Sequence, residues 1–230
     1  AKLGIDRSNV SALRVVRSVL DARKRNHPRY IYTVEVDVSA SLASIALPPD
    51  ASYAEPPPPK AARVPSPPAM RPLIVGMGPA GLFCALELAE RGVNSIVLER
   101  GRDVVERRKD VARLMRDGTL KTESNMNFGE GGAGAYTDGK LSTRLNHPMV
   151  RQVIETFAHY GAPDNILIDG KPHIGSDLLP FAVEKLRRDL VDRGVEVRFD
   201  TRVTDLLYRD DRVAGVVLAD GTTIESDRVV

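Results

Sequence analysis

A glycine motif between two hydrophobic segments constrains the fold of this chain more than any other feature. Gly76, Gly78 and Gly81 follow an apolar strand predicted at residues 72–75 and precede a helix predicted at residues 79–91. In such a unit the first glycine allows a tight turn, the second lets a phosphate approach the backbone, and the third lets helix and strand pack closely. The motif therefore predicts a Rossmann-like domain that binds a dinucleotide at the helix N-terminus, where Pro79 and Ala80 lie.

The residues after this motif continue an α/β pattern. A second strand is predicted at residues 95–98, and Glu99 closes it, where a carboxylate accepts ribose hydroxyls and repels a 2′-phosphate. Further helices are predicted at residues 103–115, 149–160 and 177–192, the last with Ser176 as its N-cap, and a short strand at 166–168.

The last part of the chain has the pattern of consecutive antiparallel strands. They are predicted at residues 196–199, 202–208, 212–218 and 222–230, with turns at Asp210-Asp211 and Asp220-Gly221. The predicted fold class is therefore α/β, with a parallel sheet followed by an antiparallel β-meander.

A second glycine-rich loop, at residues 127–141, indicates which dinucleotide binds. Its glycines include Gly131, Gly132, Gly134 and Gly139. Their backbone N–H groups are suited to an anion-binding nest, and glycines let the chain lie against a flat ring. A domain that binds NAD usually has no such element before its next strand. The loop favours FAD, and an NAD-binding domain without flavin remains the alternative.

The first 47 residues are predicted to form a separate small module. Val10, Leu13, Val16 and Leu20 have the spacing of one helix face, and residues 29–38 alternate like a half-buried strand. One helix and one or two strands are too little to fold alone. We therefore expect a ferredoxin-like α/β module whose first strand is missing, with the basic residues 23–25 at a solvated helix end.

A proline-rich segment at residues 48–70 separates this module from a domain at residues 71–230. It includes four consecutive prolines at 56–59 and is expected to be an extended linker. The module and the linker are candidate contacts for a protein partner. The chain begins with Ala1 and stops at Val230 within a predicted strand, so we expect a fragment cut at both ends, with the domain at residues 71–230 incomplete at its C-terminus.

Composition argues against several classes of site and location. Cys84 is the single cysteine, which excludes an intrachain disulfide, and the four histidines lack metal-ligand spacing, so no metal site is expected. The net charge of +2 is spread among mixed charges, which argues against nucleic-acid binding. No membrane helix and no signal peptide is recognised, and we expect a cytoplasmic protein.

Residues 127–141, together with Glu99-Arg100-Gly101 and residues 171–177, resemble a bacterial family of largely uncharacterised FAD-dependent dehydrogenases, often called NAD(FAD)-utilising dehydrogenases. The resemblance covers the whole chain, and the family has the glutathione-reductase-like fold. It implies an oxidoreductase that passes hydride through flavin N5 to or from an unknown substrate, with NAD(P)H as a suggested electron donor. A non-catalytic FAD-binding or redox-sensing protein is the alternative. The return strand that follows the meander in this fold is expected to be absent from this chain.

The resemblance also implies site residues by position. Gly76, Gly78 and Gly81 are expected at the pyrophosphate, Glu99 at the adenosine ribose, and Val203 at the adenine through its backbone, and Arg100 is expected to contact the cofactor. Further expected cofactor contacts are Arg107 at a phosphate, Gly131, Gly132, Gly134 and Gly139 on the flavin side, Asp138 at a turn or a ribityl hydroxyl, and Lys140 near flavin N1. No catalytic residue is identified.

Overall fold

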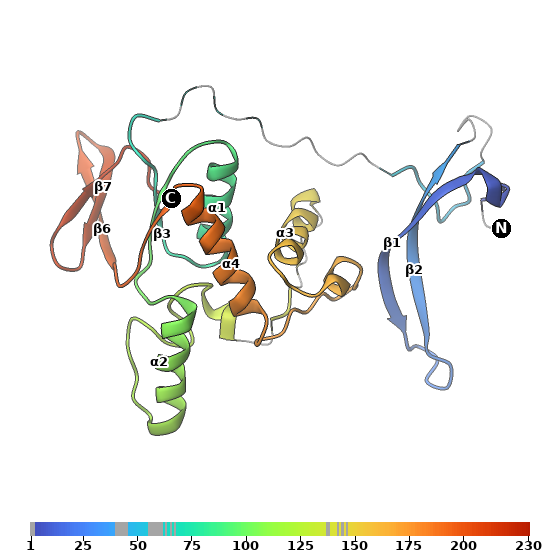
Figure 1. Cartoon of the computed structure of the whole chain (residues 1–230), viewed down its shortest axis with the longest axis horizontal. Coiled ribbons are helices and arrows are strands. Elements are labelled where there is room, and N and C mark those ends of the chain that lie inside the picture. Colours follow the sequence, from blue (N-terminus) through green and yellow to red (C-terminus); the bar gives the residue numbers. More distant parts are fainter. Residues whose placement is uncertain are drawn as a thin grey trace.

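The computed structural model describes residues 3–39, 46–54, 62, 64, 66, 68–136, 139–141, 143, 145 and 147–230. Of the expected proline-rich linker, residues 55–61, 63, 65 and 67 lie outside these residues. Before it lies a β-hairpin, and after it a layered α/β domain (Figure 1). None of the helices in the described residues is both long enough and apolar enough to span a membrane.

The centre of the α/β domain is a parallel sheet in the order β3-β4-β5, formed by Leu73–Val75, Ile96–Leu98 and Glu196–Arg198. Strand β5 was expected to open the meander, but it pairs in parallel with β4. On the other side of the sheet, Arg228–Val230 run beside β3, with Val75 N donating to Val230 O at 2.8 Å. The expectation that the return strand is absent is therefore wrong, because residues 228–230 pair with this sheet after the meander.

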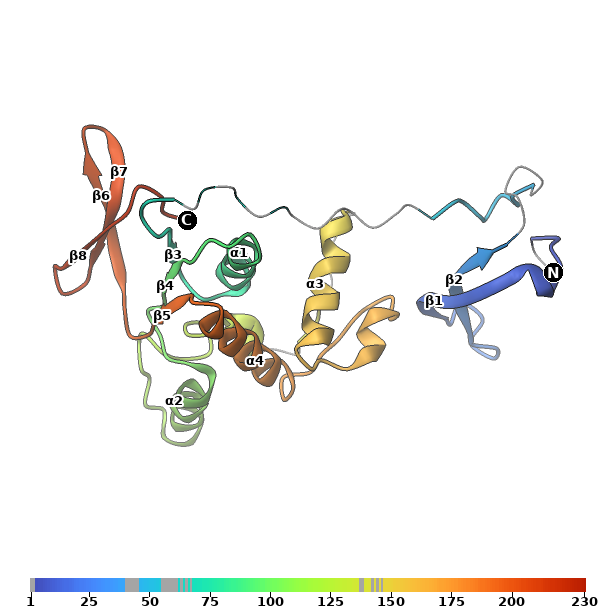
Figure 2. The same ribbon diagram turned by 45° about the horizontal axis from the view of Figure 1, so that its top comes forward.

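Helices cover one face of this sheet, as Figure 2 shows. They are α1 (Pro79–Glu90) and α4 (Leu179–Asp192), and α2 (Val104–Asp117) packs against α4. Helix α3 (Pro148–His159) lies farther from the sheet, and its Phe157 meets Phe83 of α1. Ile74 and Val97 point from the sheet into the larger hydrophobic core, where Leu82 of α1 and Leu186 of α4 are also buried. Successive side chains of a strand point to opposite faces of the sheet, so Ile74 faces the helices and its neighbour Leu73 faces the opposite layer.

The other face of the sheet packs against an antiparallel meander of β6 (Val203–Arg209), β7 (Arg212–Leu218) and β8 (Thr223–Glu225). Leu73, Ile96 and Leu98 meet the buried Val216 there and form a second core. Asp210 and Asp211 have φ angles of 49° and 60°, which produce the expected tight turn between β6 and β7. The predicted meander is confirmed, although its last strand ends at Glu225.

Two local predictions in this domain are wrong. Residues 166–168 were expected as a strand, but Asp164–Leu167 form a 3-10 helix after Pro163, which places Ile166 in the core. A three-residue apolar run is too short to distinguish the two structures. Helix α4 starts at Leu179 with Leu178 as its N-cap, without the expected cap from Ser176, although Pro180 does lie in the first turn.

The N-terminal residues form a two-stranded antiparallel hairpin, so the helix expected at residues 10–20 is wrong. Strand β1 (Val10–Asp21) pairs with β2 (Arg29–Val38), and the register shifts between Val15 and Arg17. A bulged residue interrupts the two-residue alternation of a strand. It leaves Leu13 and Leu20 seven residues apart yet on one face, which imitates the period of a helix. A short 3-10 helix, Arg7–Asn9, precedes β1.

Candidate functional site

The first glycine loop has the geometry that its sequence predicts. Gly76 has φ of 98° and turns the chain between β3 and α1. A Cβ on Gly81 would lie 2.0 Å from Gly76 O, so the close approach of helix and strand requires this glycine. A Cβ on Gly78 would meet nothing within 4 Å, which leaves open space in front of the loop.

Helix α1 begins at this open space with its N–H groups available. Gly78 is the N-cap and supplies no side-chain acceptor, and Pro79 occupies the first turn. The first N–H groups of a helix lack intrahelical partners and favour an anion. Because no side chain caps them, this helix end has the properties of a phosphate-binding site.

Glu99 connects the first loop to the end of β4. Its side chain is buried, Oε2 accepts from Met77 N at 2.7 Å, and Oε1 accepts from Gly101 N at 2.8 Å. A carboxylate offers about four lone-pair positions. Glu99 therefore fixes the loop and still has acceptor capacity for a ligand hydroxyl.

The second glycine loop packs directly on the first. Gly131 N donates to Met77 O at 2.8 Å, and a Cβ on Gly132 would lie 3.3 Å from Cδ of Pro79. Gly131 and Gly132 have φ angles of 79° and 61°, a region that L side chains rarely adopt. The two glycine loops, distant in sequence, therefore form a single surface.

Arg107 of α2 holds the second loop in place from inside the protein. Nε donates to Asn125 O at 2.7 Å, Nη1 to Glu130 O at 2.6 Å and to Gly132 O at 2.8 Å, and Nη2 to Met126 O at 3.0 Å. The side chain has no exposed surface, and its guanidinium lies 4.6 Å from the centre of the Tyr136 ring. The structure thus gives Arg107 main-chain partners, whereas a phosphate was expected.

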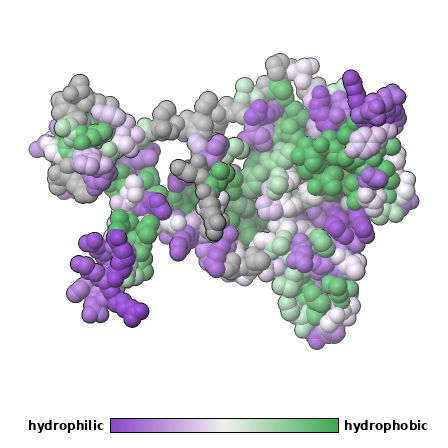
Figure 3. Space-filling view, turned by 180° about the vertical axis from the view of Figure 1, so that it is seen from behind, coloured by the Kyte–Doolittle hydropathy of each residue, from purple (hydrophilic) through white to green (hydrophobic). Residues whose placement is uncertain are grey.

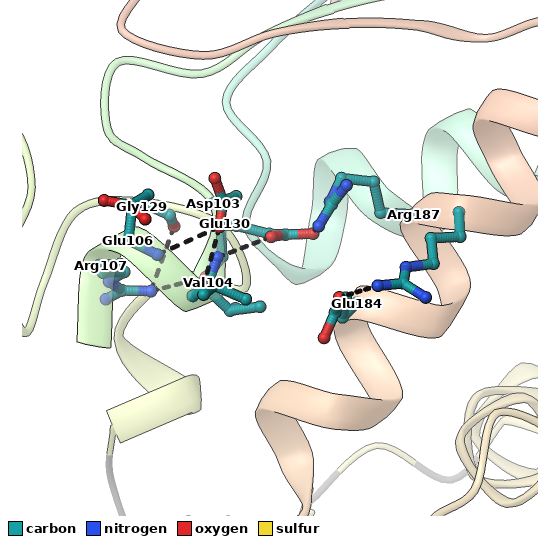
Figure 4. A network of polar contacts seen from close by, with 10 residues as sticks. Asp103, Val104, Glu106, Arg107, Gly129, Glu130, Glu184 and Arg187 are labelled. Carbon is teal, nitrogen blue, oxygen red and sulfur yellow. Dashed lines mark hydrogen bonds and ion pairs between the residues drawn. The ribbon is translucent and has the colours of Figure 1, made fainter. Parts of the chain in front are cut away.

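Glu130 joins the same loop to two helices (Figure 4). Oε2 accepts from Val104 N at the start of α2, and Oε1 accepts from Nε of Arg187 in α4, at 2.8 Å and 2.7 Å. Glu130 is fully buried, and burial raises the pKa of its carboxyl, an effect that the Arg187 charge opposes. The loop is therefore anchored from both sides by buried charged groups.

A cavity of about 340 Å³ opens beside the two loops. Six of the expected cofactor residues line it: Gly76, Gly78, Glu99, Arg100, Gly132 and Val203. The cavity therefore brings together residues from both loops, from the end of β4 and from the start of β6. A separate cavity of about 510 Å³, lined by Met70 and by residues of β7 and β8, contains none of the expected site residues.

The cavity wall also includes residues that the sequence argument did not select. The guanidinium of Arg100 lies 4.2 Å from the centre of the Phe128 ring, and both residues line the cavity together with Asn127 and Thr201. Glu123 pairs with Arg100 at 2.6 Å, and this hydrogen bond lowers the pKa of the Glu123 carboxyl. A planar, partly exposed cation beside an aromatic ring is a suitable neighbour for a flat base.

The remaining expected residues lie elsewhere. Gly139 and Lys140 are not in the cavity wall: Ile174 N donates to Gly139 O at 2.9 Å, and Lys140 pairs with His173 in an antiparallel bridge. Gly134 belongs to the 3-10 helix Ala133–Tyr136. Asp138 lies outside the described residues.

The chain is similar in sequence to a longer protein over its whole length. An uncharacterised protein of Clostridium beijerinckii is 35% identical over 232 residues, which is all of this chain and 43% of that protein. The chain therefore spans less than half the length of this relative.

Among solved structures, L-proline dehydrogenase from P. horikoshii is 14% identical with a TM-score of 0.46, over 71% of this chain and 52% of that chain. Glycerol-3-phosphate dehydrogenase from Bacillus halodurans, solved with FAD, is 14% identical with a TM-score of 0.42, over 69% of this chain and 33% of that chain. The model of the FAD binding domain family matches residues 70–230, which include both glycine loops and the cavity. The chain belongs to the FAD binding domain family.

Proposed function

We propose that this chain binds FAD in the cavity beside the two glycine loops and forms the cofactor-binding part of a flavin-dependent oxidoreductase. One observation carries the proposal: the uncapped N-terminus of α1, with open space at Gly78, adjoins a cavity that contains the buried carboxylate Glu99. A site for a dinucleotide needs donors for phosphate and an acceptor for ribose hydroxyls, and this site has both.

Each part of the site has a proposed role. Gly76, Gly78 and the first turn of α1 bind the pyrophosphate through backbone N–H groups. Glu99 accepts hydrogen bonds from the adenosine ribose, and Val203 presents its backbone to the adenine. Arg100, supported by Glu123, lies over one side of the adenine region with Phe128.

The second loop is proposed to position the flavin side. Gly131 and Gly132 lie against the first loop, and Gly134, Gly139 and Lys140 follow along the chain. Arg107 and Glu130 act on the cofactor through this loop, because their polar atoms hold its carbonyls and its flanking helix. Both are therefore positioning residues.

When bound, FAD supplies hydride transfer at its N5 atom. The protein residues bind and orient the cofactor, and no residue of this chain is assigned a catalytic role. NAD(P)H is the proposed electron donor. We assign no substrate to this chain, and turnover is tested with the whole protein.

The test is to purify the full-length protein, record its absorbance spectrum, release any chromophore by heat and identify it. Flavin bands near ~450 nm and FAD in the supernatant support the binding proposal. Oxidation of NADH or NADPH with a broad set of acceptors then supports the oxidoreductase proposal. A colourless protein that takes up no added FAD contradicts the first, and tightly bound FAD without turnover contradicts the second.

A further inference from the structure

The N-terminal hairpin has two faces of opposite chemistry. Residues opposite each other in the register share a face, so Leu20 lies next to Tyr30 and Val15 next to Val34. We call this side the apolar hairpin face. Its large exposed side chains are Leu13, Val15, Leu20, Tyr30, Tyr32 and Val34, and the residues that complete it, at positions 10, 18, 36 and 38, are uncharged as well. The other face, the charged face, carries pairs such as Arg14 with Glu35 at 3.2 Å.

The apolar hairpin face is open to solvent. Leu13 is 62% exposed and Tyr30 61%, and the rings of Tyr30 and Tyr32 stack with their centres 6.2 Å apart. At about 200 Å² for a fully exposed side chain, the six large side chains expose roughly 600 Å² together. Figure 3 shows hydrophobic side chains on the strands of the hairpin, next to its hydrophilic turn. A patch of this size marks an interaction surface.

The α/β domain contacts the hairpin without covering this face. Ser18 N donates to Ile168 O at 2.6 Å and Gly170 N donates to Ser18 O at 2.9 Å, so residues 168–170 lie along the outer edge of β1. A Cβ on Gly170 would lie 2.7 Å from Cγ2 of Val19, which belongs to the charged face. Neither strand contains a buried residue. A two-stranded hairpin without a packed face is marginally stable in water, so a second layer is required.

We propose that this second layer is the apolar hairpin face of a second copy of the chain, so that the protein forms a dimer with twofold symmetry. In such a dimer the face packs against itself, and an uncharged face brings no like charges together. Two faces of this size bury roughly 1,200 Å² in total, which reaches the lower end of specific protein–protein interfaces. The composition of the face agrees, because aromatic residues are enriched and charged residues depleted at the centre of interfaces.

The charges along the hairpin define how the two copies are oriented. The turn half, residues 17–32, has a net charge of +4, and the open half, residues 6–16 and 33–38, has a net charge of −1. The charged residues of the turn half are Arg17, Asp21, Arg23, Lys24, Arg25 and Arg29, and those of the open half are Asp6, Arg7, Arg14, Glu35 and Asp37. A parallel arrangement would bring the two basic turns together, whereas an antiparallel one places each basic turn at the acidic open end of the other copy. The two hairpins of the dimer are therefore antiparallel.

The position of the hairpin leaves room for a second copy. Figures 1 and 2 both place the hairpin at one end of the molecule and the central sheet towards the other. The cavity beside the glycine loops is lined by residues between Val75 and Val203, and none of them belongs to the hairpin. The dimer therefore leaves the proposed cofactor site open, and the two proposals can fail independently.

The experiment measures the molar mass of the full-length protein by analytical ultracentrifugation over a range of concentrations. Two single variants introduce the same charge on opposite faces: Val34→Asp on the apolar hairpin face and Thr33→Asp on the charged face, opposite Arg17. Both positions are exposed and hold β-branched residues of similar size, so strand propensity changes similarly. The same measurement at low and high salt tests the antiparallel orientation. Flavin absorbance and melting temperature of every variant report on the α/β domain.

We expect a dimer of the unmodified protein and an unchanged dimer of Thr33→Asp. Dimerisation of Val34→Asp should be weaker by about 100-fold or more, because the symmetry places two like charges in one apolar interface. High salt should weaken the dimer, since it screens the attraction between basic turn and acidic end.

A protein that is monomeric at every concentration would overturn the proposal, as would equal effects of the two substitutions. Slow hydrogen–deuterium exchange of residues 10–38 in such a monomer would assign the face to another part of the same polypeptide. A dimer that strengthens with salt would overturn the antiparallel orientation. Loss of flavin absorbance with an intact dimer would contradict the cofactor proposal alone.

Discussion

Replacement of Arg107 by methionine is the sharpest test of how the second glycine loop is held. The guanidinium is fully buried and donates to main-chain carbonyls of residues 125, 126, 129, 130 and 132. Methionine keeps the aliphatic stem but ends near the position of the arginine Nε and has no hydrogen-bond donor. Arg107→Met therefore removes the donors and leaves the space of the guanidinium to water.

The expected magnitude follows from the carbonyls left without a donor. Each buried acceptor that loses its partner costs about 1–3 kcal/mol. Since the loop relaxes and admits water, the total loss of unfolding free energy is smaller than the sum over all the carbonyls. It should be on the order of 4 kcal/mol, similar to the cost of removing one partner of a buried charged pair. For a domain of this size the melting temperature falls by about 2–4 °C per kcal/mol, so a loss on the order of 10 °C is expected.

The assay compares thermal unfolding and FAD affinity of the full-length variants. Arg107→Lys keeps up to three donors and should lose about half as much stability. Arg113→Met is the matched control, because Arg113 lies exposed on the same helix, and a change within about 0.5 kcal/mol is expected there. If Arg107→Met and Arg113→Met melt within about 2 °C of each other and bind FAD equally, the positioning role is refuted.

Three further outcomes test the remaining geometry. Gly78→Val should weaken FAD binding at least 10-fold without lowering the melting temperature, because its Cβ enters open space. Gly81→Ala should lower the melting temperature, because its Cβ would meet Gly76 O at 2.0 Å. Equal melting temperatures of these two variants would contradict this expectation. Phe128→Ala, measured by FAD titration, should cost about 0.5–1 kcal/mol of binding through the lost partner of Arg100, and an unchanged affinity would exclude that contact. Burial raises the pKa of Glu130, so the folded state holds its proton more tightly than the unfolded state does, and stability falls as pH rises through the folded pKa. Glu130→Gln should lack this decline in denaturant unfolding measured from about pH 4.5 upwards, and parallel pH profiles of the two proteins would argue against it.

Local sequence patterns predicted the structure correctly where a residue's role depends on its neighbours along the chain. Gly76 and Gly81 are required by a turn and by a helix packing on the strand just before it, so their spacing predicts their geometry. The two-aspartate turn of the meander was predictable for the same reason. The family match over residues 70–230 agrees with this part of the prediction.

Prediction failed where a residue's partner is distant in sequence, or where a bulge interrupts the hydrophobic period of a strand. The register shift near Val16 makes a strand resemble a helix, and no single-sequence period reveals a bulge. The pairing of Val230 with β3 joins residues that are far apart in sequence. Pattern reasoning assigns such a segment to its nearest neighbours, here the meander.

Arg107 illustrates why a charged residue near a phosphate motif is difficult to interpret from sequence. Basic side chains bind phosphates, but a guanidinium also satisfies several carbonyls at once, and a glycine-rich loop with positive φ angles presents carbonyls that no regular structure satisfies. A Cβ on Gly129 would lie 2.5 Å from Cδ of Arg107, so the arginine and the glycines require each other. The glycines of the second loop thus serve the inner contact with Arg107 as well as the outer contact that we propose with FAD.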